Sequence, residues 1–249
     1  MRFHHRCICP RWAAILPPMD AKQRAAEAAL KYVESGMVVG LGTGSTADFF
    51  LRALAAAIKS KQLLDIRGVP TSKQSERRAI ELGIPLTTLA EHPRPNVTID
   101  GADEVAPNLD LIKGLGGALL REKIVAQNSA KLVIIAGANK TVQKLGSKSM
   151  LPVEVAQFAH EVQEPFLRSL GAQPMLRRTP AGEAFITDND NYIYDCRFPA
   201  GIAAPHELAH SLRSRAGIVE TGLFLGIASV ALIANEAKVE ERFAGTAAH

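Results

Sequence analysis

The strongest constraint on the fold of this chain is an alternation of two kinds of segment between residues 37 and 138. Short apolar runs rich in β-branched residues, such as KLVIIAGA at 131–138, are separated by runs of strong helix formers, such as ADFFLRALAAAIKS at 47–60. Strands that alternate with helices usually form a parallel sheet covered on both faces. The alternation therefore predicts an α/β domain with a mainly parallel sheet.

The individual segments of this region can be placed from their apolar patterns and their ends. The first helix should begin after Asp20, a good N-cap residue, and Gly36 should end it. We expect the other helices at 47–60, 73–83 and 118–130. We expect strands at 37–42, 96–100 and 131–138, and a strand with its following loop at 63–72.

The pattern changes after about Leu151, where the apolar runs become shorter. We expect strands at 151–157, 174–178, 184–188 and 192–198, and helices at 160–171 and 206–217. This order is typical of a small α+β domain, of the ferredoxin-like type. The apolar run at 222–235 should return to the large sheet as one strand. We therefore expect a large domain at 19–150 together with 222–249, and a small domain at 151–221.

Composition limits the classes of partner. The chain has 249 residues, of which 47% are hydrophobic, so it can bury a real core. Its net charge of +4 comes from scattered basic residues, and aromatic residues make up only 5%. A nucleic-acid interface usually has a clustered basic face or stacking aromatics, so we expect no nucleic-acid partner. No apolar run approaches the roughly 20 residues of a membrane span, so we expect no membrane partner either.

Three cysteines argue against a disulfide framework and favour a reducing, cytoplasmic location.

The first eighteen residues differ from the rest of the chain, and we expect a disordered or non-native leader at 1–18 that precedes the true start at Met19. The apolar run at 12–16 is too short for a signal peptide. The leader holds two histidines and two cysteines that could bind a metal, but they lack the paired spacing of a zinc site. They are His4, His5, Cys7 and Cys9.

A glycine-rich loop, GLGTGSTA, joins the strand at 37–42 to the next helix. It lacks the Gly-Lys-Ser/Thr of a Walker A loop. A dinucleotide site would need an acidic residue at the end of the second strand, and 69–73 holds none. Backbone N–H groups with the hydroxyls of Thr43, Ser45 and Thr46 could instead cradle the oxygens of a phosphate or a sugar. The alternative is a tight turn that needs glycine only for its backbone angles.

The motif DGADEV follows the strand at 96–100. Asp100 ends that strand, where its side chain can enter the crevice at the carboxyl edge of the sheet. Gly101 allows a sharp turn, and Asp103 brings a second carboxylate into the same loop. The alternative is an Asx-type turn in which the carboxylates only cap backbone N–H groups. Glu104 is either solvated or a supporting group.

The segment KGLGGALLREK places Lys113 before a glycine-rich turn and Glu122 about one turn into the following helix. The Lys113 ammonium could neutralise a carboxylate, bind phosphate or stabilise an enediolate. Glu122 shares a helix face with Leu119 and Ala126, so burial could raise its pKa into the range of a general base. The alternative is an exposed glutamate that pairs along the helix.

The motifs GTGSTA, DGADE, KG-G-GALLREK and LPVEV, in this order, resemble ribose-5-phosphate isomerase of the A type over about residues 21–235. The resemblance implies a Rossmann-like large domain beside a smaller α+β domain. It also implies an aldose-ketose isomerase of the non-oxidative pentose phosphate pathway. The enzyme would act on a small-molecule sugar phosphate, without a cofactor, as a homodimer or homotetramer.

The resemblance also implies site residues. The catalytic set would be Glu122 as general base with Asp100, Lys113 and Asp103. Three substrate loops would include Thr43, Gly44, Ser45 and Thr46; Gly101 and Ala102; and Gly114, Leu115 and Gly116. Lys140 and Lys22 would also bind the substrate. No metal is expected, because no His, Cys and carboxylate set has ligand spacing and Lys113 can supply positive charge.

Two positions depart from the family pattern. The family usually has glycine or a polar or basic residue where Leu115 stands, so the backbone of Leu115 must serve. An aspartate of the family is absent from the run at 136–140, which affects the support of Lys140.

Two alternatives remain open: a related sugar-phosphate enzyme, such as an amino-sugar phosphate deaminase or a coenzyme A transferase, and a sugar-phosphate sensor domain. A sensor would need a DNA-reading helix-turn-helix, for which residues 1–19 are too few.

Overall fold

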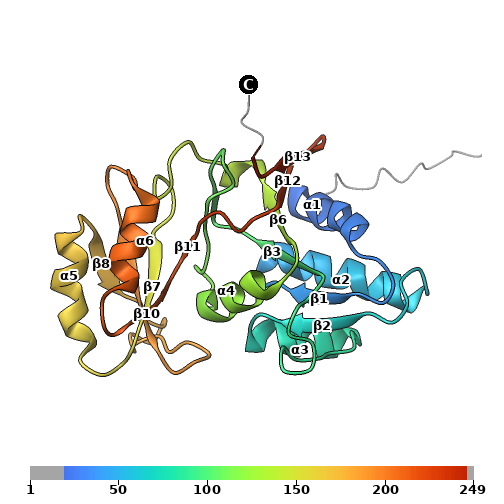
Figure 1. Cartoon of the computed structure of the whole chain (residues 1–249), viewed down its shortest axis with the longest axis horizontal. Coiled ribbons are helices and arrows are strands. Elements are labelled where there is room, and N and C mark those ends of the chain that lie inside the picture. Colours follow the sequence, from blue (N-terminus) through green and yellow to red (C-terminus); the bar gives the residue numbers. More distant parts are fainter. Residues whose placement is uncertain (1–19, 246–249) are drawn as a thin grey trace, which may run out of the picture.

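The computed structural model describes residues 20–245 and contains three sheets. The six-stranded sheet with its helices lies on the right of Figure 1, and a four-stranded sheet with two helices lies on the left. A three-stranded sheet is formed by β4 (Glu104–Val105), β5 (Leu111–Ile112) and β11 (Leu223–Phe224). Helix α4 (Leu119–Asn128) lies in the middle of the view, between the two larger sheets.

The large sheet has the strand order β13-β12-β6-β3-β1-β2. Its strands are β1 (Val38–Leu41), β2 (Arg67–Pro70), β3 (Val97–Gly101), β6 (Leu132–Gly137), β12 (Val230–Ala234) and β13 (Val239–Phe243). All neighbouring pairs are parallel except β12 with β13. The expected α/β fold with a mainly parallel sheet is therefore confirmed.

Helices cover both faces of this sheet because side chains alternate along each strand. In β6, Val133 and Ile135 pack in one apolar cluster with α1 (Ala21–Ala29) and α2 (Ser45–Lys59). Leu132, Ile134 and Ala136 of the same strand belong to a second cluster, with Ala126 of α4. A strand buried on both faces reads as a continuous apolar run, as LVIIAG does here.

Side chains cap the starts of two helices, α1 and α3. The Asp20 carboxylate accepts the backbone N–H of Lys22 at 3.1 Å and so caps α1. Ser72 and Ser75 form a capping box at the start of α3 (Lys73–Leu82). The expectation that Gly36 ends the first helix is wrong. The α-helix ends at Ala29 and continues only as a 3₁₀ turn (η1, Leu30–Tyr32), and Gly36 lies in the next turn with φ +83°.

The four-stranded sheet is antiparallel, with the order β10-β7-β9-β8. Its elements are β7 (Leu151–Val155), a 3₁₀ turn (η3, His160–Val162), α5 (Gln163–Ser169), β8 (Gln173–Leu176), β9 (Tyr192–Arg197), α6 (Pro205–Arg213) and β10 (Ile218–Thr221). The order strand-helix-strand-strand-helix-strand is the ferredoxin-like arrangement that the sequence predicted. The boundaries proposed for the two domains stay a prediction.

One predicted strand is wrong, and another is only partly right, because its C-terminal part, β12, joins the large sheet as expected. The run at 184–188 forms only an isolated bridge between Arg178 and Ala184, and the Thr187 hydroxyl donates instead to the buried Glu154 carboxylate at 2.8 Å. The run at 222–235 is split into β11 and β12 rather than forming one strand. The split occurs at Gly226, which has φ +67° and donates its N–H to Asp110 at 2.8 Å.

The predicted leader at 1–18, with its two histidines and two cysteines, lies outside the described residues. Within residues 20–245, no helix is long and apolar enough to cross a lipid bilayer.

Candidate active site

The site lies where two neighbouring parallel strands, β1 and β3, end. The chain runs from β1 to β2 on one side and then crosses to β3 on the other side of β1, so the strand order reverses between β1 and β3. Ligands of open α/β sheets bind at such a reversal, outside the carboxyl ends of the strands. Gly42 follows β1, and a Cβ at this position would lie 2.4 Å from Oδ1 of Asp100. Only glycine lets the two strand ends approach this closely.

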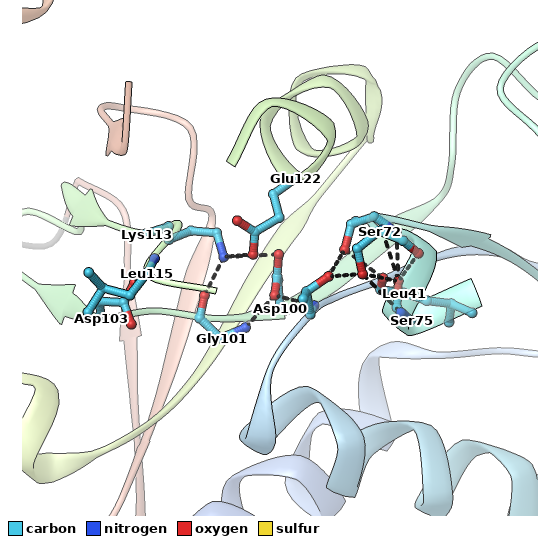
Figure 2. Close-up of polar contacts among 11 residues, drawn as sticks. Leu41, Ser72, Ser75, Asp100, Gly101, Asp103, Lys113, Leu115 and Glu122 are labelled. Atoms are coloured by element: carbon cyan, nitrogen blue, oxygen red, sulfur yellow. Dashed lines mark hydrogen bonds and ion pairs between the residues drawn. The ribbon is translucent and has the colours of Figure 1, made fainter. Parts of the chain in front are cut away.

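Asp100 is fully buried at the end of β3. Its Oδ1 accepts the N–H groups of Gly101 at 2.7 Å and Thr43 at 3.0 Å, and its Oδ2 lies 3.0 Å from Nζ of Lys113 (Figure 2). One oxygen thus caps backbone N–H groups, as in the turn alternative, while the other forms an ion pair. Asp100 fixes the relative positions of all three loops.

Lys113 follows β5 and is 2% exposed. Its ammonium donates to the Gly101 carbonyl at 2.7 Å and to Oε1 of Glu122 at 3.0 Å, besides its ion pair with Asp100 (Figure 2). Burial alone would lower the pKa of Lys113, but the charges of Asp100 and Glu122 outweigh it and raise that pKa. Lys113 therefore keeps its positive charge at neutral pH.

Glu122 is 4% exposed and lies in the first turn of α4, on the face that also buries Leu119 and Ala126. Burial, together with the negative charge of Asp100, raises the pKa of Glu122 to about 7, against the opposing effect of Lys113. Its second oxygen, Oε2, is buried without a hydrogen-bond partner among the described residues. The alternative of an exposed, paired glutamate is excluded, and Oε2 is free to take or give a proton.

Asp103 holds the glycine-rich turn in place and does not orient the Lys113 side chain. Its Oδ2 accepts the N–H of Leu115 at 3.0 Å, and no contact of Asp103 with the Lys113 ammonium is found among the described residues (Figure 2). The turn needs positive φ at Gly114 (+93°) and Gly117 (+85°), which glycine adopts at little cost. The backbone N–H of Leu115 is thus used to hold the turn.

The loop after β1 divides its hydroxyl groups between two tasks. Oγ1 of Thr43 hydrogen-bonds at 2.8 Å to the hydroxyls of both Thr71 and Ser72, so it supports the loop. Ser45 begins α2, and its hydroxyl accepts from Nζ of Lys22 at 3.1 Å. From the sequence we could not distinguish these hydroxyls. In the structure, the Thr43 hydroxyl supports the loop and the Ser45 hydroxyl lies at a helix N-terminus.

Most of the predicted site residues line one cavity of about 140 Å³. The lining residues are Lys22, Thr43, Gly44, Ser45, Thr46, Gly101, Ala102, Asp103, Lys113, Gly114, Gly116, Glu122 and Lys140. Asp100 and Leu115 lie directly behind this lining and contact it. Within residues 20–245 no group of three or more His, Cys, Asp or Glu side chains is arranged to hold a metal ion.

Two supporting interactions hold the loops of the site. Of the two alternatives for Glu104, the structure favours the supporting group: Glu104 is fully buried and accepts the N–H groups of Gly146, Lys148 and Ser149. The second interaction was not predicted. Arg177 of the small-sheet region donates to the carbonyl of Leu115 at 3.0 Å. No local pattern could reveal that contact, since it joins residues 62 positions apart.

Comparison with known proteins identifies relatives of the chain. Residues 67–238 match the family model of ribose 5-phosphate isomerase A (phosphoriboisomerase A). The ribose-5-phosphate isomerase A of Roseiflexus castenholzii is 53% identical over 213 residues, which cover 86% of this chain and 91% of that protein.

Solved structures agree as well. The ribose 5-phosphate isomerase of Plasmodium falciparum is 38% identical with a TM-score of 0.87, covering 92% of this chain and all of the other. A D-ribose-5-phosphate isomerase in complex with phospho-erythronic acid is 37% identical with a TM-score of 0.86, covering 90% and 97%. On its sequence and its fold, the chain belongs to the ribose 5-phosphate isomerase A family.

Proposed function

We propose that the protein interconverts D-ribose 5-phosphate and D-ribulose 5-phosphate through a cis-enediolate. The observation that carries this proposal is the buried Glu122 carboxylate, whose Oε1 contacts Lys113 and whose Oε2 has no protein partner in the described chain. Family membership and the names of the relatives support the substrate. Glu122 and Lys113 line the same cavity, which offers a base, an ammonium and several backbone N–H groups to one small molecule.

Glu122 acts as the general base that moves a proton between C2 and C1 of the sugar. A base works best when its pKa lies close to the working pH, and the pKa of Glu122 is raised to about 7. A positioned general base contributes roughly 10² to 10⁴ in rate. The same carboxyl group returns the proton to the neighbouring carbon, so one residue completes the transfer.

Lys113 and the glycine-rich turn stabilise the enediolate oxygens. The ammonium of Lys113 stays charged because its pKa is raised. It lies beside the Glu122 carboxylate, close to the place where the enediolate oxygens develop negative charge. One preorganised donor of this kind contributes about 10² to 10³ in rate. Asp100 assists opening of the furanose ring and moves protons between the sugar oxygens. Asp103 acts indirectly, since it holds the turn through Leu115.

The Thr43–Thr46 loop binds the phosphate end of the substrate. It leads into the N-terminus of α2, where free N–H groups and the helix dipole favour an anion. Lys22 contacts Ser45 at this point, and Lys140 lines the same cavity. Neither lysine forms an ion pair with a carboxylate in the described part of the chain, so both charges are available to a phosphate.

The activity is tested by incubating the pure protein with ribose 5-phosphate and a chelator while ketose absorbance is followed. In D₂O, deuterium should appear at C1 of the ribulose 5-phosphate formed. Ketose formation that survives the chelator is expected, and no ketose at any protein concentration would contradict the proposal. Lys22→Met should raise KM for ribose 5-phosphate while leaving the residual activity on unphosphorylated ribose unchanged, if the phosphate end is assigned correctly.

Other measurements separate the alternatives. A coenzyme A transferase would form a covalent glutamyl adduct with acyl-CoA, detectable by mass spectrometry. A deaminase would release ammonia from an amino-sugar phosphate, and a sensor would bind ribose 5-phosphate without converting it.

We also propose that the protein works as a homodimer or homotetramer in the cytoplasm, within the non-oxidative pentose phosphate pathway. Light scattering after size exclusion would measure the number of subunits.

A further inference from the structure

Arg177 lies just after β8 and is held by Asp195 of β9. Its Nε donates to Oδ2 of Asp195 at 2.8 Å and its Nη2 to Oδ1 at 2.5 Å, which is the two-pronged geometry that arginine forms with a carboxylate. The two side chains are only 13% and 9% exposed. The guanidinium therefore has a fixed orientation, set by the small sheet.

The third donor of this guanidinium crosses to the glycine-rich turn. Nη1 of Arg177 donates to the Leu115 carbonyl at 3.0 Å, while the N–H of Leu115 donates to Asp103. The two peptide groups that flank Leu115 are thus held from different sides, one by the loop after β3 and one by the small sheet. A peptide that is bonded in this way cannot rotate without breaking a hydrogen bond.

The orientation of the Leu115 carbonyl fixes a second group. The peptide between Leu115 and Gly116 is trans, so its N–H points opposite to its C=O. With the carbonyl turned toward Arg177, the Gly116 N–H must point away from Arg177. Gly116 lines the substrate cavity, and its N–H has no protein acceptor among residues 20–245.

A packing contact holds the next residue of the turn. A Cβ at Gly117 would lie 2.6 Å from Cζ of Phe185, so the ring packs directly on the backbone there. Cζ of Arg177 lies 5.5 Å from the centre of the same ring. Arg177 and Phe185 together form a surface of the small-sheet region against which the turn rests.

We propose that Arg177 is a positioning residue for the isomerase reaction, held by Asp195. By fixing the Leu115 carbonyl, it directs the Gly116 N–H into the cavity as a donor to the developing enediolate oxygen. The proposal rests on the proposed function and extends it, because it assigns a role to a part of the chain that does not touch the substrate.

The role makes a specific kinetic prediction. A donor that acts mainly on the charge of the transition state affects kcat more than KM. Loss of one such donor costs about 10² to 10³ in rate, and a donor that is misdirected rather than deleted should cost about 10 to 10². Phospho-erythronic acid carries an anionic carboxylate that can accept the same N–H, so its inhibition constant should weaken by a similar factor.

The test uses the full-length chain with three variants. Arg177→Met leaves Asp195 buried without a partner, which could unfold the protein, so Arg177→Met/Asp195→Leu replaces the whole pair with apolar groups. Arg178→Met is the matched control, since Arg178 is adjacent but donates to the Gly182 carbonyl, away from the turn. We expect the first two variants to lose about 10- to 100-fold in kcat with KM changed less than about threefold, and the control to match the wild type.

Chemical rescue separates positioning from a general loss of structure. In a fourth variant, Arg177→Ala, guanidinium at millimolar concentration should restore part of kcat, because it can occupy the gap between Asp195 and the Leu115 carbonyl. It should not change the wild type or the control. A misfolded variant would show no such recovery.

The inference is overturned if the double variant, folded by circular dichroism, keeps wild-type kcat and wild-type inhibition by phospho-erythronic acid. It is also overturned if kcat falls equally in Arg178→Met. A wild-type protein that makes no ketose at all would instead reject the proposed function, and with it this extension. Activity of the wild type alongside unchanged activity of the double variant rejects only the role of Arg177.

Discussion

Lys113 and Glu122 are joined inside the protein, with Nζ of the lysine 3.0 Å from Oε1 of the glutamate and both side chains at most 5% exposed. The same ammonium also lies 3.0 Å from Asp100, so two carboxylates share one positive charge. If both carboxylates are ionised, the group of three carries a net negative charge in a buried site. Burial is the main reason why the pKa of Glu122 is raised, and the negative charge of Asp100 adds to it.

Removing the ionisable group of Glu122 should abolish most of the activity. In Glu122→Gln the shape and the contact with Lys113 are kept, but no proton can be taken from C2. We expect kcat to fall by at least about 10². The measurement is steady-state ketose formation, with Glu207→Gln, an exposed position on α6, as the control. Near-wild-type turnover in Glu122→Gln would remove it from the role of base.

The pH dependence of kcat/KM should reflect Glu122. The base must be ionised, so activity should rise as the pH increases through about 7. The negative charge of Asp100 raises the pKa of Glu122, so Asp100→Asn should move this rise to lower pH, although the rate itself falls. The substrate phosphate titrates equally in both proteins, so the difference between the two profiles belongs to the enzyme. A profile unchanged in position, or moved to higher pH, would contradict the electrostatic assignment.

The buried Glu122 carboxylate should also reduce the stability of the protein at neutral pH. Its pKa is near 4.5 in the unfolded chain and about 7 in the fold, so folding favours the protonated form. Its stabilising contribution is complete below about pH 4.5 and is lost as the pH rises through about 7. Glu122→Gln should therefore gain unfolding free energy relative to the wild type across this range. Denaturant titrations at several pH values measure the difference, and a constant difference would argue against a raised pKa.

The glycine after β1 should be essential for both stability and activity. A Cβ at Gly42 would lie 2.6 Å from Cα of Asp100, a backbone atom that cannot move without displacing β3. We expect Gly42→Ala to lower the melting temperature by several degrees, since strain of this kind costs about 1 to 3 kcal/mol. Gly101→Ala is the control for stability, because its Cβ would find no heavy atom nearer than 4.0 Å. Equal melting temperatures for the two variants would show that β1 and β3 can separate freely.

Much of the fold was predictable because its signals are local. The alternation of apolar runs and helix formers gave the parallel sheet, and Asp20 marked the start of the first helix. The failures came where a distant partner decided the outcome. The run at 222–235 is apolar throughout, but it is broken at Gly226, which bonds to Asp110 more than a hundred residues away. The run at 184–188 is β-like in composition, yet Thr187 is used by the buried Glu154.

The site shows the same division. The sequence by itself determined which chemical groups are present, namely the glycine turns, the carboxylates of Asp100 and Glu122 and the ammonium of Lys113. Only the tertiary structure decided that one ammonium serves both carboxylates, that Asp103 holds Leu115, and that Arg177 reaches the turn from the small sheet. Residue types and short-range periodicity are written along the chain, whereas burial, charge sharing and the direction of a peptide N–H depend on segments that meet only when the chain folds.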